Sequence, residues 1–328
     1  MNTNTRLFLI FTLILAFCAI SAEAKGNKYA LFIGINNYPD TIGPLSGCEN
    51  DAKQMKKTLT LKYGFKAANT TVLLSEGATR QSIIDNLKMY AEKASAGDVF
   101  VMQYSGHGSL FPDAYSEEQD ETRDIFFDDP GSDFIDYPRD KYDSTIVPID
   151  AMETTSGKPW MNMILDDELF AMFSEFTKKG AQVVFISDSC FSGDISRAKA
   201  TKEKMRAISV TRVFGAKSFE AIKFAKPATT RTVTNPRPMN NLYITMTGAD
   251  ADELASDGAP KAIQMGLFTE NLVKYLNAKG ATAMTYSKLM TKVSADVKKA
   301  SDRGDRDQNP QLEKRFGNPD MLIFSFPK

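Results

Sequence analysis

Cysteine, histidine and tryptophan are scarce in this sequence of 328 residues, which has three, one and one of them. Cys18 lies in an N-terminal segment that we expect to be removed, so Cys48 and Cys190 remain. Two cysteines exclude a disulfide framework, although one Cys48–Cys190 bridge could still form. An excess of either charge is also missing, because 40 basic and 41 acidic residues leave a net charge of −1. This balance argues against general nucleic-acid binding.

A long apolar run occurs at the N-terminus. Arg6 precedes an apolar stretch over residues 7–20, and Ala22-Glu23-Ala24 forms an A-x-A cleavage pattern. These three features predict a signal peptide over residues 1–24. The run is short for a helix that spans a membrane. We therefore expect export to the periplasm or the exterior after cleavage near Ala24, and no membrane contact for the mature protein.

Apolar strand-like runs and amphipathic helices alternate along residues 25–328, and no internal repeat is evident. This alternation predicts an α/β fold with one mostly parallel sheet and helices on both faces. The expected strands cover residues 29–36, 71–74, 99–104, 142–150, 183–186, 242–248 and 321–326. The expected helices cover residues 52–63, 79–94, 166–179, 266–277 and 286–300.

Two segments of opposite charge interrupt this pattern. Residues 113–153 hold fourteen acidic residues against three basic ones, a local balance of −11, and are expected to form a solvated loop. Residues 197–240 hold eleven basic residues against two acidic ones, a balance of +9, with prolines at the far end. We expect an exposed, protease-sensitive linker there. It separates a part formed by residues 25–196 from one formed by residues 241–328.

A cysteine and the single histidine each follow a buried strand. His107 lies between Gly106 and Gly108, and Cys190 lies two residues after Asp188 in a run of small and polar residues. The carboxyl ends of parallel strands meet at one edge of a sheet, where ligands bind. A structural histidine and a small buried cysteine are the plainer interpretations. The matched placement favours a Cys–His pair for nucleophilic catalysis, which a Cys48–Cys190 bridge would disable.

These motifs together resemble the caspase-like cysteine peptidases (peptidase family C14, clan CD), on the metacaspase and bacterial orthocaspase side. The resemblance extends over nearly all of residues 25–328 and implies a single domain with the caspase-hemoglobinase fold. It is carried by Tyr104-Ser-Gly-His-Gly108 and Asp188-Ser-Cys-Phe-Ser-Gly193, and also by the segments at residues 29–36, 45–51, 266–269 and 309–311. Two residues depart from the metacaspase pattern: Phe191 stands where a histidine is usual, and Arg197 replaces an aspartate.

The resemblance implies a thiol protease that hydrolyses peptide bonds through a Cys190–His107 dyad. The backbone N–H groups of Cys190 and Gly108 would bind the oxyanion. Asp51, Asp188 and Ser105 match residues that line the pocket for the side chain before the cut. Two carboxylates there would select Arg or Lys. A zymogen of this kind would cut itself within the basic linker.

No cofactor is expected to be required. In several metacaspases calcium binds through aspartates that match Asp143, Asp166 and Asp167, and oxygen ligands suit this ion. Arg197 departs from that ligand set, and an aspartate pair at a helix start also suits the helix dipole. Expected partners are protein or peptide substrates with Arg or Lys at the cleavage site. We expect no nucleic acid and a monomer. A catalytically silent caspase-like interaction module is the alternative, and an asparaginyl or separase-type peptidase is a further one.

Overall fold

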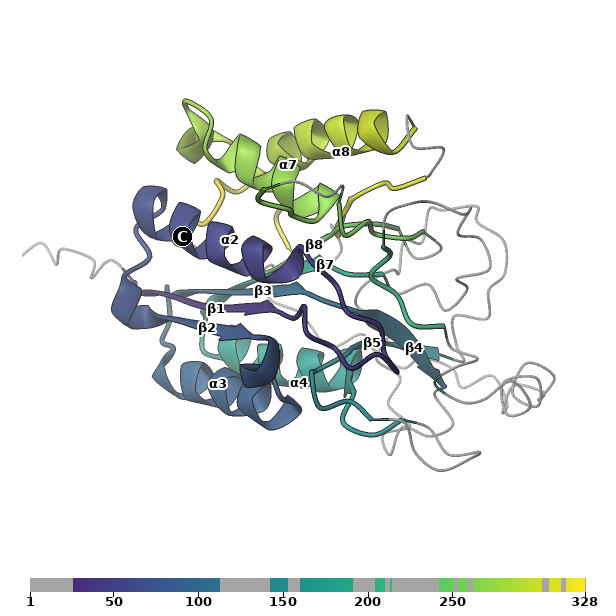
Figure 1. The fold of residues 1–328 in the computed structure, drawn as a ribbon. Helices are drawn as coiled ribbons and strands as arrows, with labels where there is room; N and C mark the ends of the chain where they lie inside the picture. The colour runs from purple at the N-terminus through teal and green to yellow at the C-terminus, as the bar shows by residue number, and fades with distance from the viewer. Residues whose placement is uncertain are drawn as a thin grey trace, which may run out of the picture.

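The computed structural model describes ten stretches of the chain: residues 26–112, 142–152, 160–190, 204–209, 213, 242–250, 253–258, 262–302, 307–313 and 317–327. The predicted signal peptide and most of both charged segments lie outside these residues. A six-stranded sheet runs through the molecule between two layers of helices (Figure 1). Among the described helices, none combines the length and apolarity needed to cross a bilayer.

The strand order of this sheet is β2-β1-β3-β7-β8-β9. The first five strands in that order pair in parallel, and β9 pairs antiparallel with β8. Their bounds are β1 (Lys28–Gly34), β2 (Thr70–Leu74), β3 (Val99–Ser105), β7 (Gln182–Asp188), β8 (Tyr243–Thr247) and β9 (Gln311–Glu313). The predicted mostly parallel sheet is therefore confirmed. Every residue of β3 and β7 is buried, which explains their nearly continuous apolar runs.

Helices cover both faces of the sheet, as expected (Figure 1). Helices α3 (Arg80–Lys93) and α4 (Asp166–Lys178) bury one core with side chains such as Leu87 and Phe173. Helices α2 (Cys48–Lys62), α7 (Leu267–Leu276) and α8 (Tyr286–Asp302) bury the other core. Thr79 caps α3 by accepting a hydrogen bond from Ser82 N at 3.1 Å, so this helix starts at the predicted place.

A small antiparallel sheet follows directly after β3. It contains β4 (Gly108–Pro112), β5 (Tyr142–Ile146) and β6 (Ile164–Leu165) in that order. The strand expected over residues 142–150 is confirmed in its first half. His107 thus lies between the carboxyl end of β3 and the start of β4.

The prediction is wrong for the last strand. Residues 321–326 form turns, in which Ile323 and Phe324 are buried in the α2–α7–α8 core. Phe324 adopts φ +50° and donates its N–H to Tyr286 Oη at 2.9 Å. This segment fills space between helices instead of pairing with a strand. The edge strand is β9, which is not among the strands that the sequence predicted.

Candidate active site

Strand register brings the cysteine and histidine motifs to the same edge of the sheet. Strands β3 and β7 are parallel neighbours, and Ser105 pairs with Asp188 at their carboxyl ends. His107 and Cys190 each follow two residues later. An ideal Cβ built on Gly108 would lie 2.1 Å from the carbonyl oxygen of Cys190, so these two backbones touch. Only glycine permits this approach.

A third segment lies against both motifs. Residues 204–209 belong to the basic linker, and the carbonyl oxygen of Arg206 accepts two backbone hydrogen bonds. Gly108 N donates at 3.0 Å and Cys190 N donates at 3.2 Å. These are the two N–H groups that the sequence predicted for an oxyanion hole. Two N–H groups that converge on one carbonyl oxygen are the arrangement that stabilises an oxyanion.

Backbone hydrogen bonds and two isolated β-bridges hold the linker segment on both sides. Toward β4, Ile208 N donates to Gly108 O at 2.9 Å. Toward the loop before α7, Arg206 N donates to Ala255 O at 3.1 Å, and Asp257 N donates to Lys204 O at 2.9 Å. Backbone pairing of this kind binds an extended peptide whatever its side chains are. The segment is therefore seated as a peptide substrate would be.

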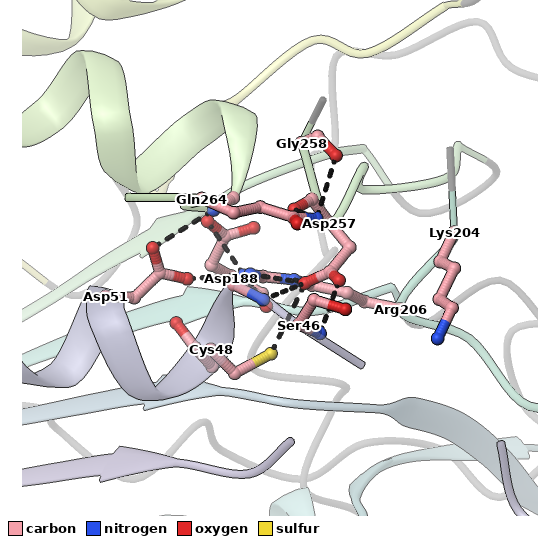
Figure 2. A network of polar contacts seen from close by, with 12 residues as sticks. Ser46, Cys48, Asp51, Asp188, Lys204, Arg206, Asp257, Gly258 and Gln264 are labelled. Carbon is pink, nitrogen blue, oxygen red and sulfur yellow. Dashed lines mark hydrogen bonds and ion pairs between the residues drawn. The ribbon is translucent and has the colours of Figure 1, made fainter. Parts of the chain in front are cut away.

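The Arg206 side chain fills a pocket of three carboxylates, those of Asp51, Asp188 and Asp257, which we call the acidic pocket (Figure 2). All four side chains are fully buried. Nη2 lies 2.7 Å from Asp51 Oδ2 and 3.0 Å from Asp257 Oδ1, and Nη1 lies 3.1 Å from Asp188 Oδ2. The arrangement binds a cation, since buried charges require partners.

The segment at residues 266–269 orients two of these carboxylates. Gly266 N donates to Asp51 Oδ1 at 3.0 Å, and Thr269 donates to Asp188 Oδ2 from its N at 2.9 Å and from its Oγ1 at 2.6 Å. Ser105 is buried beside them and forms a hydrogen bond with Asp51. Asp51, Asp188 and Ser105 are thus brought together as predicted. Residues 266–269 therefore orient the carboxylates of Asp51 and Asp188 in the acidic pocket.

Burial dominates the ionisation of the site. It raises the pKa of Asp51 to about 7, although Arg206 acts in the opposite direction. It also raises the pKa of the Cys190 thiol to about 12, despite hydrogen bonds from the backbone. One of these is donated by Ala255 N to Cys190 Sγ at 2.7 Å. With the linker seated, the thiol is therefore neutral at physiological pH.

Two buried tyrosines and a backbone carbonyl surround His107. Its Nε2 lies 2.7 Å from Gly43 O, and a carbonyl only accepts, so Nε2 carries the hydrogen and Nδ1 is the basic nitrogen. Tyr38 Oη accepts from His107 N at 3.2 Å, and Tyr104 Oη donates to His107 O at 2.5 Å. The rings of Tyr38 and His107 lie 4.8 Å apart. These contacts fix the imidazole and its tautomer.

Two expectations need correction. The basic linker is not exposed throughout, because Arg206, Ala207 and Ile208 are buried, while Lys204 is exposed as expected. Cys48 and Cys190 are both free and buried, so the bridge considered above is not formed. The sequence also missed Arg206 and Asp257 as site residues. Arg206 is one of eleven basic residues in the linker and Asp257 one of several acidic residues in a polar loop, so composition did not single them out.

The calcium prediction falls largely outside the described side chains. Asp166 is the first residue of α4 and is buried, while the side chains of Asp143 and Asp167 are not described. Among the side chains that are described, no group of three His, Cys, Asp or Glu residues could hold a metal ion. Asp166 alone does not make a ligand set, so no step of the chemistry is derived through calcium.

Several known proteins are similar to this chain. The profile of the caspase domain family matches residues 27–318. Metacaspase-4 of Arabidopsis thaliana is 36% identical over 173 residues, which are 51% of this chain and 34% of that protein. Metacaspase III c of Phaeodactylum tricornutum is 30% identical over 183 residues, which are 55% of this chain and 47% of that protein. The chain thus spans about half or less of the length of these relatives.

A solved structure supports the fold. The crystal structure of a protein from Geobacter sulfurreducens superposes with a TM-score of 0.60 at 22% identity, and the match covers 92% of this chain and 100% of that one. At this identity the likeness bears on the architecture alone.

Proposed function

Because the chain belongs to the caspase domain family, we propose that it is a cysteine endopeptidase that cuts peptide bonds after Arg or Lys. The observation that carries the proposal is the seating of Arg206. Its side chain lies in the acidic pocket while its carbonyl oxygen accepts hydrogen bonds from Gly108 and Cys190. The side chain that determines specificity and the carbonyl group that would be attacked thus belong to the same residue, Arg206. A preference for Asp before the cut would need basic groups in this pocket instead.

In this mechanism Cys190 is the nucleophile and His107 is the general base and acid. His107 Nδ1 takes the thiol proton, and Sγ attacks the carbonyl carbon to form a tetrahedral oxyanion, which Gly108 N and Cys190 N stabilise. His107 then gives the proton to the leaving amine, and water hydrolyses the thioester. The raised pKa of the Cys190 thiol in the seated state means that this proton must be removed as attack occurs.

We also propose that the chain processes itself, and that the bond cut is Arg206–Ala207. Arg206 has the side chain and the carbonyl placement that a substrate residue needs. Until it is cut or displaced, the same segment fills the acidic pocket and excludes other substrates. The intact chain is therefore a zymogen that its own linker inhibits.

Purified chains with Cys190→Ala, with His107→Ala and without substitution test both proposals. We expect the unsubstituted chain to yield a fragment that begins at Ala207, identified by mass spectrometry, and both variants to stay intact. The processed enzyme should hydrolyse a peptide with Arg before the cut and not the matched peptide with Asp. Self-cleavage by either variant would reject the Cys190–His107 dyad. An intact unsubstituted chain that is inert on both peptides would favour the interaction module.

Four further predictions accompany this function. Export after removal of residues 1–24 is tested by N-terminal sequencing of the mature protein. Calcium binding through Asp143, Asp166 and Asp167 is tested by the effect of a chelator on the rate of peptide hydrolysis. The monomeric state and the lack of nucleic-acid binding are tested by light scattering of the purified protein with and without DNA.

A further inference from the structure

Asp257 is a third carboxylate of the acidic pocket, and it comes from a different part of the chain than the first two. It lies in the loop between β8 and α7, fully buried. Its Oδ2 accepts from Ser46 N at 2.7 Å (Figure 2), and its Oδ1 accepts from Gly47 N at 3.0 Å. Both donors precede α2. The carboxylate is therefore held in one orientation by the backbone before it meets any cation.

The contacts that Asp257 makes depend on the shape of a guanidinium group. Its Oδ1 accepts from Arg206 Nε at 3.2 Å and from Nη2 at 3.0 Å. Nη1 donates to the carbonyl oxygen of Asp188 at 3.1 Å. All three side-chain nitrogens of Arg206 thus have acceptors, and these acceptors lie on different sides of the guanidinium group. Nε has no counterpart in lysine, whose three donors share a single nitrogen at the end of the chain.

Two glycines give the pocket the width of a planar group. A Cβ on Gly266 would lie 2.4 Å from Arg206 Nη1 and 2.6 Å from Cζ, and a Cβ on Gly47 would lie 3.0 Å from Nη2. The guanidinium group therefore fits between Gly266 and Gly47 only because neither residue has a side chain. A narrow pocket with acceptors at fixed positions matches the planar guanidinium group of arginine. The ammonium group of lysine is a point charge and can bind only some of these acceptors.

We propose that Asp257 makes this pocket selective for arginine over lysine. The proposal rests on the function proposed above and narrows it. Asp51 and Asp188 supply attraction for any cation, while Asp257 supplies an acceptor for Nε. A lysine in the pocket would leave the buried Asp257 carboxylate without the partner that it has in Arg206, which is costly in a site closed to water.

The first experiment measures binding without catalysis. In a Cys190→Ala chain, trypsin can cut after residue 206 only when the linker leaves the pocket, and trypsin accepts both Arg and Lys. Four such chains are compared: one without further change, one with Arg206→Lys, one with Asp257→Asn, and one with both substitutions. Mass spectrometry follows the fragment that begins at Ala207. Free peptides of residues 202–212, with and without Arg206→Lys, correct for the preference of trypsin itself.

We expect the Arg206→Lys chain to be cut roughly 10- to 100-fold faster than the chain that keeps Arg206, the range for losing a hydrogen bond to a charged group. Asp257→Asn should bring the chain with Arg206 close to the rate of the Arg206→Lys chain, and should change the Arg206→Lys chain much less. Asp85→Asn is the matched control, because it removes one negative charge from the exposed side of α3, where Asp85 contacts Gln81. Equal protection of arginine and lysine at position 206, or equal effects of Asp257→Asn on both, would overturn the proposal.

The second measurement tests the selectivity itself, even if Asp257→Asn does not fold. The processed enzyme is given two peptides that differ only in Arg or Lys before the cut, and the ratio of their kcat/KM values is taken. This ratio does not depend on the fraction of folded enzyme, and we expect it to exceed about 10. A ratio near one would reject the selectivity. Failure to cut either peptide would instead count against the proposed function, while the trypsin comparison still decides the role of Asp257.

Discussion

Gly266→Ala should block the acidic pocket without disturbing the fold. Gly266 precedes α7 with φ −59° and ψ 143°, a conformation that alanine adopts freely. The added methyl carbon would lie 2.4 Å from both Arg206 Nη1 and Asp188 Oδ2. Atoms at this distance must separate by about 1 Å to reach ordinary van der Waals contact. Thr269 holds the Asp188 carboxylate in place, and the first turn of α7 is rigid. The guanidinium group of Arg206 must therefore move.

The size of the effect follows from that displacement. A shift of about 1 Å away from Asp188 breaks the contacts of Nη1 and carries the Arg206 carbonyl off the two N–H donors, and misplacement of this size costs roughly 100-fold in rate. We expect self-cleavage at Arg206–Ala207, followed on gels as a single turnover, to slow by about this factor. Hydrolysis of an Arg peptide by the processed enzyme should lose a similar factor in kcat/KM.

A matched glycine separates this effect from a general loss of stability. Gly77 is exposed, has no positive φ, and has nothing within 4 Å of the position that a Cβ would take. Gly77→Ala should therefore leave self-cleavage and the melting temperature unchanged. If Gly266→Ala cleaves as fast as Gly77→Ala while both melt alike, the pocket does not hold the residue before the cut. The reasoning from Arg206 would then be wrong.

Two other predictions concern the ionisation of the pocket and the support of the histidine. Burial raises the pKa of Asp51 to about 7, and the charge of Arg206 acts in the opposite direction. By linkage a cation binds more tightly once Asp51 is ionised, so kcat/KM for an Arg peptide should rise as pH increases from about 7. Asp51→Asn should flatten this rise, and an unchanged pH profile in the variant would refute the assignment. Tyr38→Phe removes the hydroxyl that accepts from His107 N, so it should lower kcat with little change in KM for the same peptide. A change in KM alone would mean that Tyr38 contributes to substrate binding instead of positioning His107.

The sequence alone determined the framework of this protein. Buried parallel strands have continuous apolar runs, so their places, their α/β class and the motifs at their ends follow from local composition. His107 and Cys190 follow strands that pair in register, and their meeting at one edge of the sheet needed only that topology. Asp51 and Asp188 were found through the family resemblance that these motifs carry. The strand predicted over residues 321–326 is absent, because the apolar side chains of this segment pack between helices.

Tertiary structure decided what enters the pocket. Arg206 is one basic residue among eleven, and no local pattern separates it from the other ten. Its burial depends on contacts with Asp51, Asp188 and Asp257, which lie 155, 18 and 51 residues away in the chain. Each contact is a matter of distance and angle between groups that folding brings together. The sequence predicted a cation for the acidic pocket, and only the packed chain identified which one.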